Sequence, residues 1–413
     1  MTRSPAGSNA PLRVAFVSDA VHPFHRGGKE SRLDEITRRL AATGVDVDVY
    51  TMKWWDGADH IDIDGVGFHA LGPYRALYDG ERRSMRQAIG FGVNALRLMR
   101  HSFDVVDVDH MPFFPLFTVR LVAALKRRPM VATWHEVWGA SYWRRYLGGI
   151  GGIVAAVIER LSFTLPRVVV ANSDQTASRL AAAGCRRPIE VMMPGVDLDL
   201  VDAVTVDELD HDGPVDVLFA GRLLGHKNAE VLVHAAAILA ERGVVAHTLI
   251  VGEGPERERV RDAITARNIG DRVTVTTFFP HRRTIFAAMK AARVVVLPSE
   301  REGFGMVVVE AHGCGTPVIT VDVPDNAART LVSHGRNGLV VDLSPVGLAD
   351  AIESILSGAA PLDTAPAIRA SAAPYDWDHI VGRLRELYGS VAGRTIKPAD
   401  AASEKEVPQW TSA

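Results

Sequence analysis

Short runs of apolar and β-branched residues alternate along the first half of the chain with longer stretches of mixed character. Between the first two runs, Leu33, Ile36 and Leu40 recur at helical spacing, and Gly44 follows. Strands that alternate with helices predict a parallel sheet with right-handed crossovers. The runs that predict strands lie at residues 12–18, 45–51, 105–108, 130–133 and 167–171.

The second half of the chain repeats this pattern, with a helix expected from about 228 to 242. We therefore expect the α/β class, with two Rossmann-like, doubly wound domains that face a central cleft. In such sheets ligands bind at the carboxyl ends of the strands, so functional residues are expected directly after strands. The runs of the second half lie at 215–221, 247–252, 272–278, 294–298, 318–321 and 338–341.

A segment rich in aspartate joins the two halves. Residues 197–214 end in Asp-Gly-Pro, which is a linker composition, and the boundary is expected near residue 205. The flanking ends lack periodic apolar positions and are expected to be disordered. The predicted parts are a disordered segment 1–11, an N-terminal domain 12–205, a C-terminal domain 206–374, a closing helix 375–393 and a disordered tail 394–413.

Composition and charge narrow the class of protein. The 413 residues are 47% hydrophobic and 23% charged, which is typical of soluble globular domains. The net charge, 46 basic against 49 acidic residues, is −3, so no overall field attracts nucleic acid and no such partner is expected. Cys185 and Cys314 cannot build a disulfide framework, which favours a reducing cytoplasm. The longest apolar stretches fall short of the roughly 18–20 residues of a spanning helix.

The most specific motif follows the run at 294–298 and reads Glu302-Gly-Phe-Gly305, with Glu310 further along the next predicted helix. The free N–H groups at the start of that helix favour an anion, and glycines let the backbone approach a ligand. Glu302 can accept hydrogen bonds from ligand hydroxyls. Glu310 lies among apolar residues and needs a partner, which is either a ribose diol or a structural arginine.

Two further glycine-containing segments follow predicted strands. Gly221-Arg222 precedes Lys227 at a helix start, where two cations are unfavourable unless an anion such as a diphosphate is bound. The alternative is a pair of solvated surface cations. Gly27-Gly28 follows the first strand, but neither a dinucleotide fingerprint nor a phosphate-binding Gly-Lys-Ser/Thr loop is present there.

These motifs, in this order, resemble those of retaining glycosyltransferases of the GT-B fold. The chain is similar to the family called glycosyltransferase group 1, which includes phosphatidylinositol mannosyltransferases and sucrose synthases. The turn at Pro194-Gly-Val-Asp197 and the closing segment that begins with Tyr375-Asp-Trp377 also resemble the family, in which this segment crosses back to the first domain. The resemblance implies transfer of a hexose-type sugar, with retention, from a nucleoside diphosphate sugar to an acceptor hydroxyl.

The resemblance also implies roles for single residues. Arg222 and Lys227 would hold the departing diphosphate and, with Glu302 and His135, form the catalytic set. The other donor-binding residues implied are Gly27, Gly28, Gly221, Pro280, Gly303, Phe304, Gly305 and Glu310, with Glu310 on the ribose hydroxyls and Pro280 in the loop beside the nucleobase. No cofactor and no metal are expected, and the nucleoside diphosphate sugar is a co-substrate. Four Asp-x-Asp pairs are interpreted as ordinary strand and turn residues.

The sequence leaves the acceptor open among a sugar, a cyclitol, a lipid and a glycan. Glu136, Trp138 and Trp143 follow His135 and are the preferred acceptor contacts, since aromatic faces stack on sugars, although core packing explains tryptophans as well. Basic clusters in the first domain favour either peripheral membrane contact or ordinary solvated helix faces. Two other functions stay open, which are a nucleotide-sugar epimerase and a non-catalytic nucleotide-sugar-binding protein.

Overall fold

The computed structural model describes residues 10–25, 27–79, 82–211 and 213–394. The predicted disordered segments 1–11 and 394–413 lie almost wholly outside these residues. The chain divides into two compact units. The first comprises residues 1–20, 36–131 and 381–413, and the second comprises residues 21–35 and 132–380. The borders of these two units differ from the predicted domain boundaries, and those boundaries stay a prediction.

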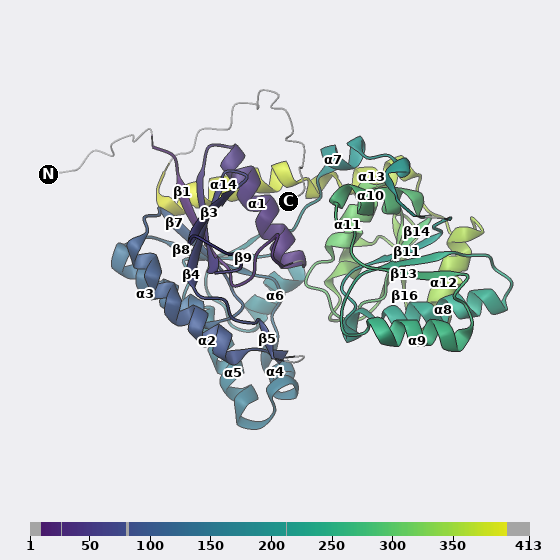
Figure 1. Cartoon of the computed structure of the whole chain (residues 1–413), viewed down its shortest axis with the longest axis horizontal. Helices are drawn as coiled ribbons and strands as arrows, with labels where there is room; N and C mark the ends of the chain where they lie inside the picture. The colour runs from purple at the N-terminus through teal and green to yellow at the C-terminus, as the bar shows by residue number, and fades with distance from the viewer. Residues whose placement is uncertain (1–9, 26, 80–81, 212, 395–413) are drawn as a thin grey trace. The chain divides into compact units, whose positions relative to one another are not determined.

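One sheet has eight strands in the order β10-β9-β8-β7-β1-β2-β4-β3 (Figure 1). Within the first unit, β1 pairs in parallel with β2 on one side and with β7 on the other, and β3 is antiparallel to β4. The strands are β1 (Arg13–Val17), β2 (Asp46–Met52), β3 (His60–Ile63), β4 (Val66–Gly72), β7 (Val105–Asp109), β8 (Met130–Trp134), β9 (Val168–Ala171) and β10 (Ile189–Val191), with the short pair β5 (Tyr78–Asp79) and β6 (Arg82–Arg83) apart from them.

Helices connect these strands. α2 packs against α3, and α4 packs against α5. Local sequence fixes several ends: Ser173 caps α6 by accepting a hydrogen bond from the Thr176 N–H, and Arg127 ends α3 in the left-handed region. The helices are α1 (Gly28–Ala42), α2 (Met85–Asn94), η1 (Ala95–Arg100), α3 (Phe114–Lys126), α4 (Gly139–Leu147), α5 (Gly149–Ser162), α6 (Asp174–Ala182) and α7 (Leu198–Ala203).

The second sheet has six strands in the order β13-β12-β11-β14-β15-β16, and all its neighbours pair in parallel. The chain order reverses between β11 and β14, so this sheet has a topological switch point there, where doubly wound sheets bind ligands. The strands are β11 (Val217–Ala220), β12 (Thr248–Val251), β13 (Val273–Thr276), β14 (Val294–Leu297), β15 (Val318–Val321) and β16 (Gly338–Val341).

Both faces of the second sheet are covered by helices (Figure 1). Alternate residues of β11 enter two separate core layers: Val217 and Phe219 pack with α8, α9 and α12, whereas Leu218 packs with α10 and α11. This burial on both faces explains the uninterrupted apolar runs in the sequence. The helices are η2 (Val206–Glu208), η3 (Gly225–Lys227), α8 (Ala229–Glu241), α9 (Arg257–Arg267), α10 (Arg282–Ala291), α11 (Met306–Gly313), η4 (Ala327–Leu331), α12 (Pro345–Leu356), α13 (Ala365–Ser371) and η5 (Ala373–Tyr375). They are followed by α14 (Trp377–Ala392), most of which belongs to the first unit.

The predicted α/β class with two parallel-sheet regions is confirmed, and each predicted strand has a counterpart within a few residues. The sequence analysis missed the β3–β4 hairpin, although Asp64-Gly65 is a favoured two-residue hairpin turn. In the closing helix, the Tyr388 hydroxyl donates a hydrogen bond of 2.6 Å to Asp107 of β7, inside the first unit. Among the described residues, no helix is both long enough and apolar enough to cross a membrane.

Candidate functional site

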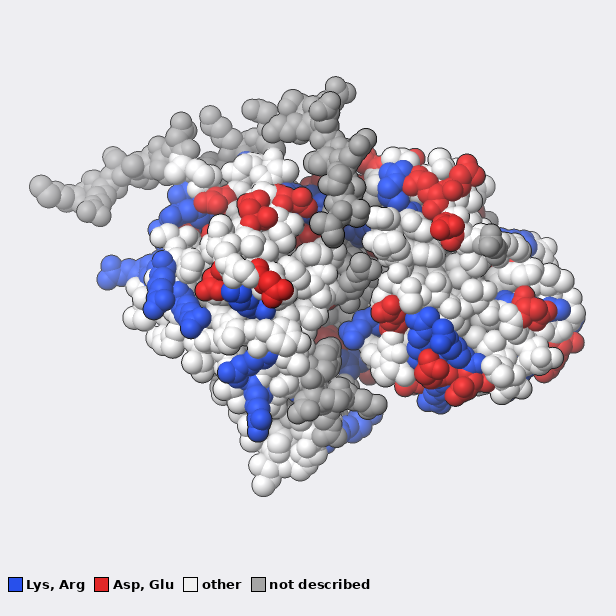
Figure 2. All heavy atoms as spheres, viewed as in Figure 1, with Lys and Arg blue, Asp and Glu red and all other residues white. Residues whose placement is uncertain are grey.

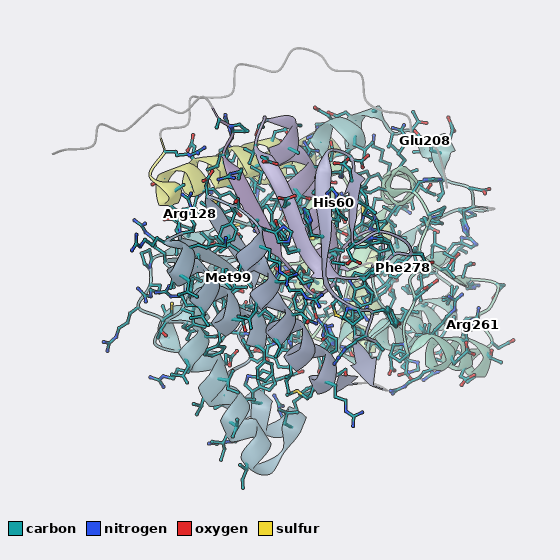
Figure 3. All side chains as sticks on the ribbon, turned by 60° about the vertical axis from the view of Figure 1, so that its left-hand side comes forward. His60, Met99, Arg128, Glu208, Arg261 and Phe278 are labelled. Atoms are coloured by element: carbon teal, nitrogen blue, oxygen red, sulfur yellow. The ribbon has the colours of Figure 1, made fainter. Side chains whose placement is uncertain are left out.

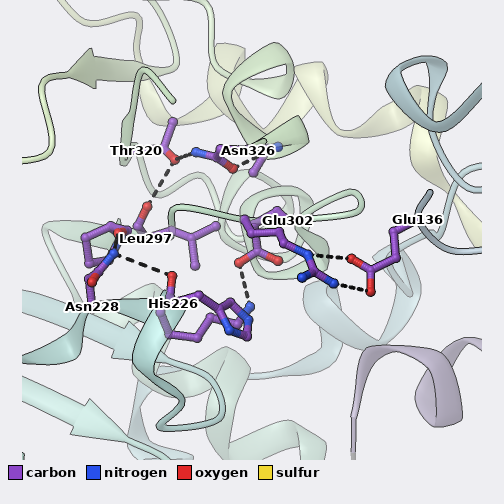
Figure 4. A network of polar contacts seen from close by, with 11 residues as sticks. Glu136, His226, Asn228, Leu297, Glu302, Thr320 and Asn326 are labelled. Carbon is purple, nitrogen blue, oxygen red and sulfur yellow. Dashed lines mark hydrogen bonds and ion pairs between the residues drawn. The ribbon is translucent and has the colours of Figure 1, made fainter. Parts of the chain in front are cut away.

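The loop between β14 and α11 is held by main-chain hydrogen bonds. The Glu302 N–H donates to the Asp325 carbonyl over 3.1 Å, and the Glu302 carbonyl accepts from the Ala327 N–H over 3.0 Å. Asn326 fixes the facing segment, because its amide donates to Thr320 Oγ1 over 3.0 Å (Figure 4). The main chain of the loop is therefore fixed by contacts within the chain itself.

Gly305 ends this loop in a conformation that favours glycine. Its φ is +102°, and a Cβ there would lie 2.5 Å from the Cβ of Ala328. The next residue begins α11, so the N–H groups of its first turn have no helical partner. Phe304 is buried and packs near Tyr375, with 5.8 Å between ring centroids, so its side chain is a core residue while its amide stays in the loop.

A lysine–glutamate ion pair joins the two predicted catalytic segments. Lys227 Nζ lies 2.5 Å from Glu302 Oε1, and both side chains are largely buried (Figure 4). Lys227 ends η3, and the following residue, Asn228, takes a left-handed conformation and donates to the Pro298 carbonyl over 3.1 Å. The segment after β11 is thereby tied to the segment after β14, at the switch point of the sheet.

Arg222 lies directly after β11, one residue beyond Gly221. In the part of the chain that the structure describes, its side chain makes no hydrogen bond and no ion pair. A cation without a partner at the carboxyl end of a central strand is suited to an anionic ligand. A Cβ on Gly221 would meet only ordinary contacts, so packing does not require a glycine there.

The histidine before Lys227 has a lowered pKa. Burial of the His226 imidazole is the largest cause, and the charge of Lys227 adds to it. The His226 carbonyl accepts a hydrogen bond of 2.9 Å from the Glu300 N–H. His226 is therefore favoured in the neutral form beside the lysine–glutamate pair.

Glu310 pairs with an arginine, as one of the two sequence alternatives expected. Arg282 Nη2 lies 2.9 Å from Glu310 Oε1, and its other arm pairs with Glu35, which is also in the second unit. Burial lowers the pKa of the Arg282 guanidinium, but the charges of Glu310 and Glu35 outweigh this effect and raise the pKa. Pro280 is exposed two residues before Arg282, in the loop between β13 and α10.

The segment after β8 contains the residues predicted to face the sugar and the acceptor. It is anchored by Glu159 of α5, whose buried carboxylate accepts hydrogen bonds from the N–H groups of Trp138 and Gly139, each over 2.9 Å. The same carboxylate accepts from Trp143 Nε1 over 3.0 Å. Burial raises the pKa of Glu159, although the three donors act in the opposite direction.

Two of the three predicted acceptor residues also contact Arg301, which precedes Glu302. Arg301 makes a two-point ion pair with Glu136, over 2.8 and 2.6 Å, and lies over the rings of Trp138 and Tyr142 (Figure 4). Burial lowers the pKa of Arg301, but the Glu136 carboxylate outweighs it and raises the pKa. Trp143 is buried and packs against Trp138.

The backbone of His135 lies against Gly303. A Cβ at position 303 would lie 2.3 Å from the His135 carbonyl oxygen, so this approach requires glycine. Gly28 lies near the same loop, since a Cβ there would be 3.6 Å from Met306 Sδ, whereas a Cβ on Gly27 would meet the Glu30 side chain. The structure thus brings His135, Gly28 and the Glu302–Gly305 loop together within the second unit.

Sequence analysis missed Glu35, Glu159, Arg282 and Arg301. Arg301 had a local signal, because it adjoins Glu302, and Glu159 had a weaker one, as an acid in the apolar run of α5. The partners of Arg282 lie 28 and 247 positions away, so no local pattern identifies them. Among the described residues, no three His, Cys, Asp or Glu side chains gather in a way that could hold a metal ion.

The second sheet is doubly wound and has a paired and an unpaired cation at its switch point. These features are typical of α/β proteins that bind an anionic ligand at that point. Known families match nearly the whole chain: the family described as Glycosyl transferases group 1 matches residues 206–371, and Glycosyltransferase Family 4 matches residues 26–200. The chain belongs to the group 1 glycosyltransferases and has the GT-B fold.

Full-length relatives support this assignment. D-inositol 3-phosphate glycosyltransferase 1 of Catenulispora acidiphila is 30% identical, over 92% of this chain and 96% of its own length. The D-inositol 3-phosphate glycosyltransferase of Gordonia bronchialis is 31% identical, over 96% of this chain and 93% of its own length. Alpha-D-kanosaminyltransferase of Streptomyces kanamyceticus is 34% identical, over 43% of this chain and 46% of its own length.

Solved structures show the same fold. Sucrose-phosphate synthase from Thermosynechococcus elongatus superposes with a TM-score of 0.74 and 21% identity, over 92% of this chain and 99% of that one. The HepE protein of Anabaena, solved with UDP-glucose, has a TM-score of 0.70 and 20% identity, over 92% of this chain and 100% of that one.

Proposed function

We propose that this glycosyltransferase moves a hexose-type sugar from a nucleoside diphosphate sugar to an acceptor hydroxyl, with retention of the anomeric configuration. The observation that carries the proposal is the cluster at the switch point of the second sheet. There Lys227 is paired with Glu302 over 2.5 Å, and Arg222 has no partner among the described residues.

The cluster suits a diphosphate that gains charge as the sugar departs. Arg222 offers a planar fork to the phosphate oxygens and Lys227 a point charge, and both stabilise negative charge that develops in the transition state. Without donor, Glu302 neutralises Lys227. With donor, the diphosphate takes over Lys227, and Glu302 accepts hydrogen bonds from sugar hydroxyls, together with the amides of Gly303, Phe304 and Gly305.

Other donor contacts follow from the same arrangement. Glu310 would bind the ribose hydroxyls while Arg282 holds its carboxylate in place, and the exposed Pro280 loop would border the nucleobase. Gly28, and Gly27 beside it, would leave room near α11, and His135 would face the sugar. Gly221 would let the Arg222 backbone approach the phosphates. No metal is assigned a role, because two side-chain cations can balance the diphosphate.

For the acceptor we propose a polyhydroxylated ring, a sugar or a cyclitol, that contacts Glu136, Trp138 and Trp143. Relatives that cover most of this chain carry inositol phosphate in their names, which supports such a ring. Trp138 and Glu136 are engaged with Arg301 in the structure, so an acceptor would share or displace that arginine.

The first experiment measures thermal shift and nucleoside diphosphate release with UDP-, GDP-, ADP- and dTDP-sugars, with inositol phosphates and aminocyclitols as acceptors. We expect one donor to stabilise the protein and be consumed, and Lys227→Ala to lower kcat at least a hundredfold. Glu310→Ala should mainly raise KM, and Arg267→Ala, on the exposed face of α9, serves as a control.

Product analysis separates the alternatives. A product anomer of inverted configuration contradicts retention, and a 2-epimer of the donor sugar would identify an epimerase. Stabilisation by donor without any turnover, across the whole acceptor panel, would favour a non-catalytic binding protein. Loss of activity in excess EDTA, restored by a divalent cation, would contradict a metal-independent reaction.

A further inference from the structure

Two adjacent helical segments of the first unit carry apolar residues on their outer face. α2 with η1 (residues 85–100) packs against α3 (residues 114–126). Their inner faces supply core residues such as Phe91, Leu98 and Leu116. Eight large apolar residues on the outer side are 37% to 64% exposed, and we call them the outer face of α2–α3: Met85, Ile89, Val93, Leu96, Met99, Phe117, Leu121 and Leu125.

The exposed residues follow the helical repeat. Ile89 and Val93 are spaced by four, and Phe117, Leu121 and Leu125 are also spaced by four, so each segment has a continuous apolar stripe. Isolated exposed apolar residues are normal, but stripes on two adjacent helices are typical of a surface that another body covers. These eight residues are nearly half of the 17 large apolar residues exposed in the described chain.

The charged residues of these two segments have one sign. Residues 85–100 and 114–128 contain seven basic residues and no acidic residue, in a chain whose net charge is −3. Arg97 donates to the Leu71 carbonyl and Arg128 pairs with Asp104, whereas Arg86, Arg100 and Arg120 are exposed without a partner among the described residues. The seven are Arg86, Arg97, Arg100, Arg120, Lys126, Arg127 and Arg128.

Figure 3 shows these helices on the side nearest the viewer, with Met99 and Arg128 labelled. On the face drawn in Figure 2, charged groups are separated by broad uncharged areas. An apolar stripe flanked only by cations is the pattern of helices that lie in the interface of an anionic lipid layer. A second copy of the same face would bring the unpartnered Arg86, Arg100 and Arg120 close to their own counterparts, which opposes self-association.

We propose that the outer face of α2–α3 docks on an anionic phospholipid bilayer. Its eight apolar side chains would enter the boundary between headgroups and acyl chains, while Arg86, Arg100 and Arg120 would contact lipid phosphates. The proposal concerns a surface of the first unit and does not depend on which sugar is transferred. It gives the enzyme a way to meet an acceptor that is carried by lipid.

The test is sedimentation with sucrose-loaded vesicles of phosphatidylcholine, alone or mixed equally with phosphatidylglycerol. We expect binding only to the mixed vesicles, and weaker binding when NaCl rises from 50 to 300 mM. Leu121→Gln with Leu125→Gln, and Arg100→Glu with Arg120→Glu, should each lower the partition coefficient at least tenfold. Val245→Gln with Val346→Gln, equally exposed elsewhere, should leave it unchanged.

Thermal unfolding of each variant verifies that folding is intact. Equal binding to both kinds of vesicle, or none to either, would overturn the proposal, as would variants of the outer face that bind like the control. Light scattering tests whether a second copy of the chain covers this face instead of a bilayer. A dimer that Leu121→Gln with Leu125→Gln dissociates, in a protein that ignores anionic vesicles, would show that a second copy covers this face.

Discussion

The loop after β14 and the segment after β8 carry the predicted donor-side and acceptor-side residues, but they are fixed in different ways. Main-chain hydrogen bonds and glycines set the first, since Glu302 is tied through its own N–H and carbonyl groups. The second depends on side chains, chiefly on the Glu159 carboxylate, which receives three N–H groups from Trp138, Gly139 and Trp143. Side-chain changes should therefore alter chemistry in the first and shape in the second.

The largest expected effect is on the segment after β8. Glu159→Ala leaves one buried and two partly buried donors without an acceptor, so we expect the free energy of unfolding to fall by about 4 kcal/mol. Glu159→Gln keeps one acceptor oxygen, so its loss of unfolding free energy should lie between zero and that of Glu159→Ala. Urea unfolding followed by tryptophan fluorescence measures both losses, with Glu241→Ala, at the exposed last residue of α8, as the control. If Glu159→Ala loses no more unfolding free energy than the control, the two segments are not fixed in different ways.

A second change tests the steric fit of the loop after β14. In Gly303→Ala the new Cβ would meet the His135 carbonyl at 2.3 Å, and neither backbone can move freely. We expect a loss of about 2 kcal/mol in urea unfolding, and a larger loss of turnover, because the loop must shift. Gly225→Ala, where a Cβ meets nothing within 4 Å, is the matched control. Equal stability of the two variants would contradict the close approach.

A third measurement concerns α11, the helix that carries this loop. His312 is buried, donates to the Asn337 carbonyl and has its pKa lowered to about 4, chiefly by burial. A folded pKa below the unfolded value of about 6.5 means that the neutral form stabilises the fold, and this stability is lost as pH falls from 6.5 towards 4. The loss should reach about 1.4 kcal/mol at pH 5.5. In His312→Gln this pH dependence should be absent, and its persistence would assign it to other groups.

The smallest expected effect on stability is that of Glu302→Gln. The amide still accepts from Lys227, so the largely buried lysine keeps a polar partner, and the loop keeps its main-chain bonds; the free energy of unfolding should fall by about 1 kcal/mol. Turnover should nevertheless fall strongly in the proposed reaction. A large loss of stability would mean that this loop, like the segment after β8, depends on a side chain.

Local sequence predicted the framework well and the pairings poorly. The runs at β11 and β14 are apolar because both faces of their sheet are buried, and the glycines after them mark the loops that carry the predicted site residues. Glu159, by contrast, serves residues about 20 positions away, and Arg301 pairs with Glu136 across 165 positions. Such pairs depend on how elements pack, which no local periodicity contains. The β3–β4 hairpin differs from these pairs, since its Asp-Gly turn is a local signal in the sequence.

The acid-free helices have a consequence for handling the protein. Seven positive charges on residues 85–100 and 114–128, within a net charge of −3, leave −10 on the rest of the chain. Positive charge is therefore concentrated on these two segments, although the chain as a whole carries a small negative charge. At low ionic strength near pH 7 we expect retention on a cation-exchange resin in spite of the negative net charge.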